Sequence, residues 1–260
     1  MSIQRIVDRI LVGVILLALW QLTSLWIGFY WVSSPLQVAQ RMVAWLSDGT
    51  LFTESGYTIG SALIGFTLGA VPGAVIPFLL RRRPVLAAIL DPYLVAGYAT
   101  PKLALTPLLI VWFGIGIWSK VALVASISFF LIFFNTQAGV RGISPQLIRM
   151  AEILGARETK VARLVVWPAA LPYILAGVRV SLPFSISGTA IAEMLSANHG
   201  LGYLIQASAV SFDPTGSFTA IITLTAILTI VNILVNRSER RIFNWRPAAA
   251  AFGRPKGALG

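Results

Sequence analysis

The sequence predicts an all-α integral membrane protein with six transmembrane helices. Composition sets the class: 57% of the 260 residues are hydrophobic and only 11% are charged, whereas about 25% of the residues in soluble domains are charged. Apolar runs set the number of spans, because about 20 helical residues cross the hydrocarbon core of a bilayer. Four runs carry no charge, at residues 10–29, 57–80, 121–140 and 216–236; two carry one cation each, at 93–118 (Lys102) and 164–192 (Arg179).

Basic residues gather in alternate connections between these spans. The N-terminal segment, residues 81–83, the segment 141–163 and the segment after residue 236 hold 16 of the 20 Lys and Arg residues, while segments 30–56 and 193–215 hold Arg41 alone. Short cytoplasmic loops collect Lys and Arg, so we expect both termini in the cytoplasm. The net charge of +11 follows from this bias and from attraction to anionic lipid. The charge therefore predicts contact with the lipid bilayer and does not require a nucleic-acid partner.

The N-terminus imitates a cleavable signal, because Arg5 and Arg9 precede an apolar run. The run stays bulky through residue 31 and no small-residue cleavage pattern follows, so we predict an uncleaved first helix. The chain has no cysteine and one histidine. This composition excludes disulfides and thiol catalysis and leaves no credible metal site. His199 itself is more typical of a loop residue than of a ligand.

A basic amphipathic hairpin, residues 144–172, interrupts the apolar spans. Ser144 is placed as N-cap with Pro145 at the first helical position, and Gly155 is placed to end a helix of about ten residues. Its apolar positions at helical spacing are Leu147, Ile148, Ala151 and Leu154. Alternating charged and apolar residues up to Pro168 predict a second short helix at an angle to the first. Such a projection either docks on a soluble partner or lies on the lipid headgroups.

Small residues recur every four positions in the second span, at Ser61, Gly65, Gly69 and Gly73. They make one face of this helix smooth, which allows close approach of a neighbouring helix. The neighbour is either another helix of the same subunit or a second copy of the chain.

The third predicted span contains two prolines and two glycines between residues 101 and 120, which predicts a broken or kinked helix. Irregular backbone at membrane depth occurs where it is buried in protein or lines a watery cavity. Lys102 lies in this segment and is a candidate for the translocation pathway; the alternatives are snorkelling or pairing with Asp91. Arg179 is a second candidate, although snorkelling toward the cytoplasmic face explains it equally well.

The hairpin resembles the cytoplasmic coupling signature of permeases in binding-protein-dependent ABC importers. That signature reads Glu-Ala-Ala, three residues, Gly, nine residues, Ile, one residue, Leu-Pro. Gly155 takes the position of the Gly, while Arg149 stands where Glu is usual, and Met150 and Trp167 also depart from the pattern. The positions to which the resemblance assigns ATPase coupling are Arg149, Ala151, Leu154, Gly155, Val165 and Pro168.

The resemblance extends over nearly the whole chain. Segments 104–120, 129–148, 192–205 and 239–247 are similar to the nitrate, sulfonate and taurine branch of these permeases. The branch implies one leading helix, with the outer loop that follows it, in residues 1–56, and a permease core of five helices in 57–245 with coupling helices at about 145–165. Residues 246–260 are expected to form a flexible cytoplasmic tail. Glu193 matches the residue that the branch usually has there, and it is the third candidate for the pathway or gate.

By the same resemblance, the chain is a multi-pass permease of a bacterial cytoplasmic membrane. The implied partners are a dimer of cytoplasmic ABC ATPases, a second permease copy in a homodimer, and a periplasmic or lipid-anchored substrate-binding protein. No phosphate-binding loop occurs in the sequence. We therefore expect no enzymatic activity, no catalytic residue and no cofactor in this chain, and ATP-Mg on the partner ATPase.

The expected substrate is a small anion such as an aliphatic sulfonate, taurine, nitrate or bicarbonate. The alternative within the branch is a thiamine-precursor-like or other aromatic compound. From other classes, a passive channel or secondary transporter remains open, although neither needs the hairpin. A membrane-embedded hydrolase would need clustered acids and bases, and the predicted spans offer no Asp or Glu at depth.

Overall fold

The chain is helical throughout the part that the computed structural model describes, residues 3–196 and 198–242. Five described helices are long and apolar enough to cross a membrane, and a sharply bent pair makes a sixth crossing when counted as one span. The prediction of an all-α protein with six spans is confirmed. The elements in chain order are α1 (Ile3–Ile27), α2 (Pro35–Ser47), α3 (Thr50–Arg81), α4 (Pro84–Ala99), η1 (Lys102–Leu105), α5 (Thr106–Phe113), α6 (Ile117–Arg141), α7 (Pro145–Ile153), α8 (Glu158–Val161), η2 (Ala162–Val166), α9 (Trp167–Ser196), α10 (Leu201–Val210) and α11 (Pro214–Ile242).

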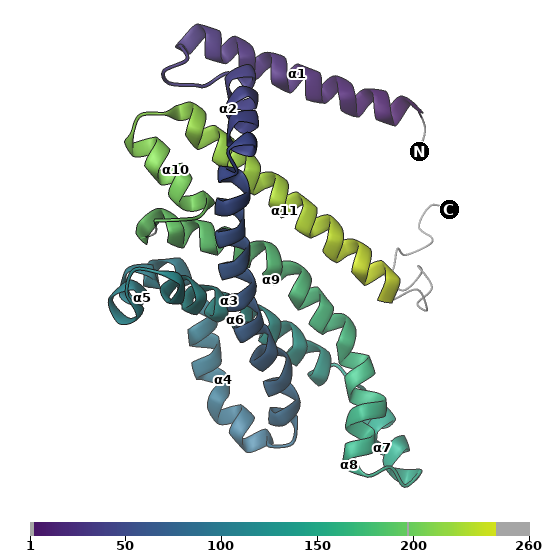
Figure 1. The fold of residues 1–260 in the computed structure, drawn as a ribbon. Coiled ribbons are helices and arrows are strands. Elements are labelled where there is room, and N and C mark those ends of the chain that lie inside the picture. Colours follow the sequence, from purple (N-terminus) through teal and green to yellow (C-terminus); the bar gives the residue numbers. More distant parts are fainter. Residues whose placement is uncertain (1–2, 197, 243–260) are drawn as a thin grey trace.

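Helix α6 forms the centre of the fold and packs against both α3 and α9 (Figure 1). The small residues of α3 make this packing possible. A Cβ atom added at Gly69 would lie 2.1 Å from the backbone oxygen of Ala125, and one at Gly65 would lie 2.8 Å from that of Val121. The smooth face of α3 is therefore used inside the subunit, as the first of the two predicted alternatives had it.

The third span is broken, as its prolines predict. Helix α4 and the η1–α5 segment meet at an angle of 82°. Thr100 has an extended conformation, with φ −61° and ψ 130°, which is the conformation that a following proline favours. The span begins at Pro84, earlier than the predicted residue 93. Helix α4 contains no buried residue among those described, so it lies at the edge of the fold.

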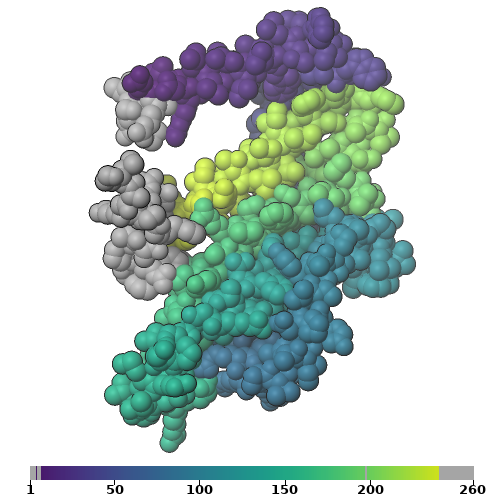
Figure 2. Space-filling view, turned by 180° about the vertical axis from the view of Figure 1, so that it is seen from behind, coloured from purple at the N-terminus to yellow at the C-terminus, as the bar shows by residue number. Residues whose placement is uncertain are grey.

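Helix α1 stands apart from the rest of the molecule (Figures 1 and 2). Nearly all of its side chains are exposed, and it is joined to the fold mainly where the chain turns into α2. Ser24 donates a hydrogen bond to the Val32 carbonyl at 2.8 Å, and the Trp20 ring lies 5.6 Å from that of Phe218 in α11. One long face of α1 is consequently free for lipid or another chain.

The two ends of the helix bundle differ in character. At the hairpin end, α3 and α6 finish in Arg81 and Arg141, and α7 and α8 project beyond them (Figure 1). At the opposite α10 end lie α2, the ten-residue helix α10 and the start of α11. There Arg41 of α2 pairs with Asp213 at 2.7 Å, which ties α2 to the start of α11. The predicted tail, residues 246–260, and the last residues of the predicted core lie outside the described residues.

Candidate functional site

The first helix of the hairpin ends as the sequence predicts. Gly155 has φ +78°, a left-handed conformation that glycine adopts without steric cost. Its N–H donates to the Glu152 carbonyl at 2.9 Å, and the N–H of Ala156 donates to the Ala151 carbonyl at 2.9 Å. These two bonds form a Schellman motif, which satisfies the last carbonyls of α7 and turns the chain.

The second half of the hairpin differs from the separate short helix that was expected. Helix α8 passes through the π-helical turn η2 directly into α9, and Pro168 is the second residue of α9 instead of a helix end. The wider π turn interrupts the regular hydrogen-bond ladder just before Pro168, where a residue without an N–H is otherwise costly. The hairpin is therefore continuous with a transmembrane helix.

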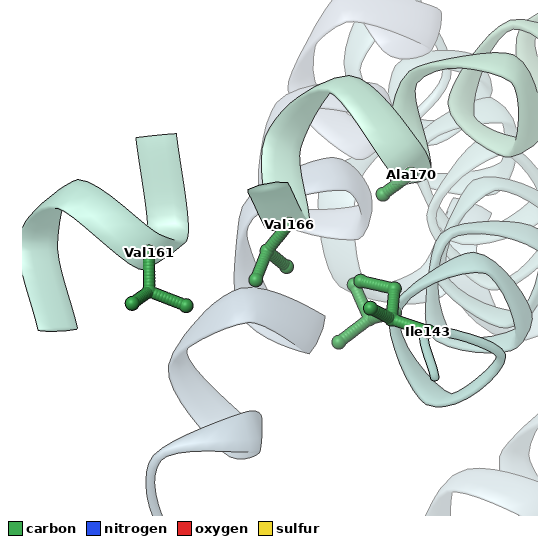
Figure 3. Packing of buried hydrophobic residues seen from close by; sticks show 5 residues of the cluster. Ile143, Val161, Val166 and Ala170 are labelled. Carbon is green, nitrogen blue, oxygen red and sulfur yellow. The ribbon is translucent and has the colours of Figure 1, made fainter. Parts of the chain in front are cut away.

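The inner face of the hairpin is fixed to the ends of the central helices. Val161 and Val166 are buried against Val140 and Ile143 at the end of α6 and against Ala170 of α9 (Figure 3). Ala151 and Val165, two of the predicted coupling positions, are partly buried and pack against this cluster. Glu158 adds two ion pairs to α3 and the residue after it, at 3.0 Å from Arg81 and 3.7 Å from Arg82. A displacement of the hairpin must therefore move α3, α6 and α9.

The outer face of the hairpin is apolar and exposed. Ile153 and Leu154 are each 84% exposed, and Leu147 and Met150 are exposed beside them. Exposed apolar side chains gathered at the polar end of a membrane protein are typical of an interaction surface. The remaining predicted coupling positions, Arg149, Gly155 and Pro168, are also exposed.

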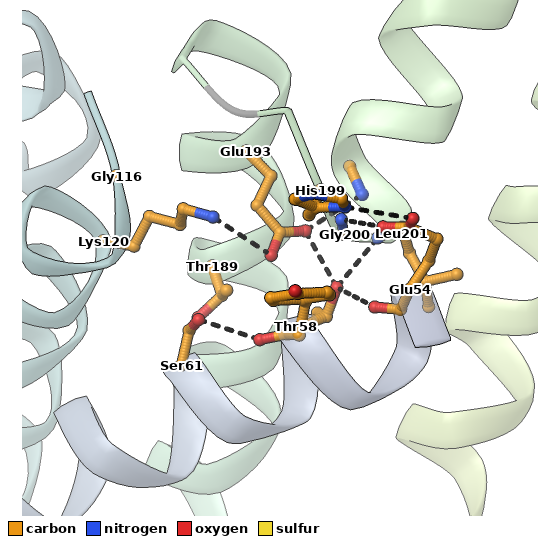
Figure 4. A network of polar contacts seen from close by, with 12 residues as sticks. Glu54, Thr58, Ser61, Gly116, Lys120, Thr189, Glu193, His199, Gly200 and Leu201 are labelled. Carbon is orange, nitrogen blue, oxygen red and sulfur yellow. Dashed lines mark hydrogen bonds and ion pairs between the residues drawn. The ribbon is translucent and has the colours of Figure 1, made fainter. Parts of the chain in front are cut away.

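At the α10 end, side chains of other helices cap the first N–H groups of α10 (Figure 4). The N–H of Gly200 donates to the Glu54 carboxylate, that of Leu201 to Thr58 Oγ1 at 2.8 Å, and that of Gly202 to Glu193 Oε2 at 3.1 Å. The first N–H groups of a helix have no partner within it, and negative charge near them is favourable. We refer to these three N–H groups, to Glu54, Thr58 and Glu193, and to Lys120, which faces Glu193, as the α10 clasp.

The clasp contains a buried ion pair. Glu193 Oε1 lies 3.7 Å from Lys120 Nζ, with 0% and 6% of the two side chains exposed, and Thr58 Oγ1 donates to Glu193 Oε2 at 2.8 Å. A buried carboxylate needs such partners, because removing one from a buried pair leaves an uncompensated charge. The pair joins the start of α6 to the end of α9.

Sequence reasoning found only part of this clasp. Glu193 was a candidate, whereas Glu54, Thr58 and Lys120 were not. One pattern in the sequence could have identified Lys120. It is a lone cation directly before the charge-free span 121–140, and Glu193 is a lone acid directly after the span 164–192, at the same end of the predicted bundle. His199 lies in the loop before α10, as expected, where its ring stacks on Tyr57 with centroids 4.5 Å apart.

Lys102 does not pair with Asp91. Its ammonium group donates to the carbonyls of Gly97, Tyr98 (3.0 Å) and Thr100 (2.8 Å) at the C-terminal end of α4, where a cation is favoured. Asp91 instead pairs with Arg141 at 2.9 Å. Lys102 thus closes the broken end of α4.

Arg179 has a different partner again. It forms an ion pair with Glu239 of α11 at 3.3 Å, and about half of its side chain is exposed. Lys102, Arg179 and Glu193 therefore have separate partners in separate places, and the structure does not bring them together into one site.

A cavity of about 610 Å³ opens beside the break in the third span. Tyr98 and Lys102 line it from one side, Phe130 of α6 from a second, and Phe184 and Ser187 of α9 from a third. Lys102 Nζ lies 4.6 Å from the centroid of the Phe130 ring, which is within cation–π range. The broken backbone lines a cavity, as irregular backbone at membrane depth requires.

A multi-pass helical bundle with a broken span, and with an exposed apolar hairpin packed on its central helices, is the arrangement expected of a membrane transport subunit. Residues 65–244 match the family model described as "Binding-protein-dependent transport system inner membrane component". The chain belongs to this family and is a permease subunit of an ABC importer, a transport component and not an enzyme.

Curated relatives match along most of the chain. It is 36% identical over 233 residues to a riboflavin transport system permease of Chloroflexus aurantiacus (89% of this chain, 87% of the relative). It is 31% identical over 232 residues to a formylaminopyrimidine transport permease of Halalkalibacterium halodurans (89% and 92%). A putative aliphatic sulfonates transport permease of Bacillus subtilis is 32% identical over 243 residues (91% and 87%).

The fold is also that of a solved importer permease. A chain from inward-facing structures of the MetNI methionine ABC transporter superposes with a TM-score of 0.61, covering 76% of this chain and 96% of that chain at 20% identity.

Proposed function

We propose that this permease relays ATP hydrolysis by separate ATPase subunits into alternating access of its helix bundle. The observation that carries the proposal is the hairpin, which has an exposed apolar outer face and an inner face fixed to α3, α6 and α9. Closure of two ATPases carrying ATP-Mg would push two hairpins together and tilt the central helices, a rigid-body change between two states.

The complex we propose holds two copies of this chain, two ATPases bound at the hairpins, and a periplasmic or lipid-anchored binding protein at the α10 end. The hairpin end is then the cytoplasmic side of a bacterial inner membrane, with both termini on that side. The basic residues support this orientation, because Arg81, Arg82 and Arg141 lie at the hairpin end.

The α10 clasp is our candidate for the outer gate. Helix α10 is too short to span the membrane, and its first N–H groups are bonded to helices α3 and α9. In this proposal the gate opens when α10 moves away from α3 and α9, a local change that breaks these bonds and accompanies the tilt of the central helices. Glu193 then acts as a gate residue, and Lys120 holds its carboxylate in place.

The relatives indicate two classes of substrate. The first is a small anion such as an aliphatic sulfonate or taurine, which the sequence analysis expected and the permease of B. subtilis supports by its name. The second is a ring compound, since two relatives are named for riboflavin and formylaminopyrimidine. The aromatic lining of the cavity beside Lys102 favours the second class.

Affinity purification from the native membrane in mild detergent, followed by mass spectrometry, tests the importer proposal. We expect an ATP-binding subunit at about one copy per permease. The matched variant is Leu154→Asp, because Leu154 is 84% exposed and its replacement leaves the buried cluster intact; we expect it to lose the ATPase. A chain that purifies alone, under conditions that preserve other transporters, would contradict the proposed docking of the ATPase on the hairpin.

A further inference from the structure

The cavity beside Lys102 has the chemistry of a site for a flat ring. Three aromatic side chains line it, Tyr98 from the end of α4, Phe130 from α6 and Phe184 from α9. Aromatic rings stack or meet edge to face with other rings, which adds to the effect of apolar burial. The three come from different helices, and Lys102 and Leu103 line the same cavity from the far side of the break.

The hydrogen-bond donors of the charged residue in the cavity are already used. Lys102 is the charged residue of the lining, and its ammonium group already donates to carbonyls at the end of α4. No carboxylate lines the cavity within the described part of the chain. A small anion would have to displace those carbonyls to reach the ammonium, and a cationic solute would meet Lys102 without a compensating carboxylate.

Polar contacts remain available at the rim. Ser187 and Thr100 line the cavity with hydroxyl groups. The Thr100 hydroxyl donates to the Ala96 carbonyl at 2.9 Å and can still accept from a ring N–H, whereas that of Ser187 can donate to a ring nitrogen or carbonyl oxygen. Gly188 of α9 faces α6. A Cβ atom added there would lie 3.0 Å from Ile127 Cδ1, so the cavity wall is closely packed on that side.

We propose that this cavity is a transit site for the planar heteroaromatic ring of a neutral or anionic substrate. The proposal rests on the importer function proposed above and names its substrate class. A pyrimidine or an isoalloxazine fits its chemistry, with the ring between the aromatic side chains and its polar atoms toward Ser187 and Thr100.

The absence of cysteine from the chain makes a direct test possible. A single Ser187→Cys variant, assembled with its ATPase in proteoliposomes, is labelled with a water-soluble methanethiosulfonate. We expect labelling at Ser187→Cys and very slow labelling at the control, Leu16→Cys. Leu16 lies exposed in the middle of α1, where lipid would surround it, and a cysteine in lipid does not form the thiolate that reacts. Riboflavin and 4-aminopyrimidine are then added as ring probes, and taurine, a small sulfonate without a ring, as the contrasting probe.

A ring probe is expected to slow labelling of Ser187→Cys, and taurine is not. Adding Phe130→Leu should weaken this protection about 2- to 10-fold, the range for loss of one aromatic pair, whereas Phe130→Tyr should retain it. The ring proposal is overturned if neither ring probe protects, if taurine alone protects, or if Ser187→Cys is as unreactive as Leu16→Cys. Co-purification of the ATPase reports on the importer function independently, so failure of the site and failure of the function are distinguished.

Discussion

Lys102 shows how a single cation can be accommodated within a membrane span. Helix α4 ends inside the span and leaves its last carbonyls without helical partners, and Lys102 supplies donors to them from the other side of the break. The carbonyls accept hydrogen bonds from the ammonium group, so neither the charge nor the carbonyls are left without a polar partner in the membrane. These bonds support a structural role for Lys102, which is to hold the break in the third span in shape.

We expect Lys102→Met to destabilise the purified complex by about 1.5–3 kcal/mol, the range for hydrogen bonds that involve a charged group. Lys102→Arg keeps donors near the carbonyls and should recover most of the loss. Thermal unfolding followed by tryptophan fluorescence measures both. If Lys102→Met melts like the wild type but loses uptake of anions at equal expression, Lys102 binds substrate directly and the structural assignment is wrong.

The Lys120–Glu193 pair is buried deeply enough that each charge depends on the other. Removing one partner of a buried pair costs about 3–5 kcal/mol. We therefore expect Lys120→Met and Glu193→Gln each to lower the melting temperature strongly, and the double variant to lie closer to the wild type than Lys120→Met does. Additive losses in the double variant would mean that the two side chains are not coupled.

At the scale of elements, the hairpin depends on the backbone conformation of Gly155. A Cβ atom added there would meet no atom within 4 Å, so within this chain a substitution acts first through the left-handed conformation. The left-handed conformation costs most L residues about 1–2 kcal/mol, and asparagine tolerates it better. We expect Gly155→Leu to uncouple ATP hydrolysis from transport, measured together in proteoliposomes, and Gly155→Asn to remain coupled. Unchanged transport in Gly155→Leu would contradict this role.

The α10 clasp predicts a measurable change in local opening. Thr58 accepts from the Leu201 N–H and donates to Glu193. Thr58→Val loses both bonds, so amide hydrogen exchange at residues 201–204 should accelerate about 10-fold, which corresponds to roughly 1.4 kcal/mol. Thr58→Ser keeps the hydroxyl and should exchange like the wild type. Equal exchange in all three proteins would show that Thr58 does not hold α10.

At the scale of the whole molecule, two helices have little cover. Helix α4 has no buried residue among those described, and the side chains of α1 are nearly all exposed. Lipid covers such faces without difficulty, but the polar groups at the break beside α4 need protein or water. We expect native mass spectrometry of the purified complex to give two permeases and two ATPases. A complex with one permease would contradict the homodimer.

Much of this fold follows from local patterns. Prolines predicted the broken span, Gly155 predicted the end of α7, and the small residues of α3 predicted a close helix contact. Each of these features acts within a few residues of the chain. The coupling and pathway roles of the nine candidate residues remain predictions, although the structure shows what each of them contacts.

The α10 clasp did not follow from local patterns, because Thr58 and Glu193 are 135 positions apart; the resemblance singled out Glu193 but not its partners. The partner of Lys102 was also missed. Asp91 precedes the last residue of α4 by about 12 Å of helix at 1.5 Å per residue, so Lys102 folds back onto the nearer carbonyls instead. The angle of the break decides which polar groups lie within reach of the Lys102 ammonium group. That angle cannot be read from the sequence.

The α10 clasp also sets an order for biogenesis. Glu54 and Thr58 leave the ribosome early, whereas Gly200, Leu201 and Gly202 leave it after most of the chain has been translated. Until then α3 can pack on α6 through its small residues, but the capping groups on α3 have no α10 to bind. A chain that stalls before residue 200 lacks α10 and α11, so the α10 end of the bundle can be completed only after the other helices have been made.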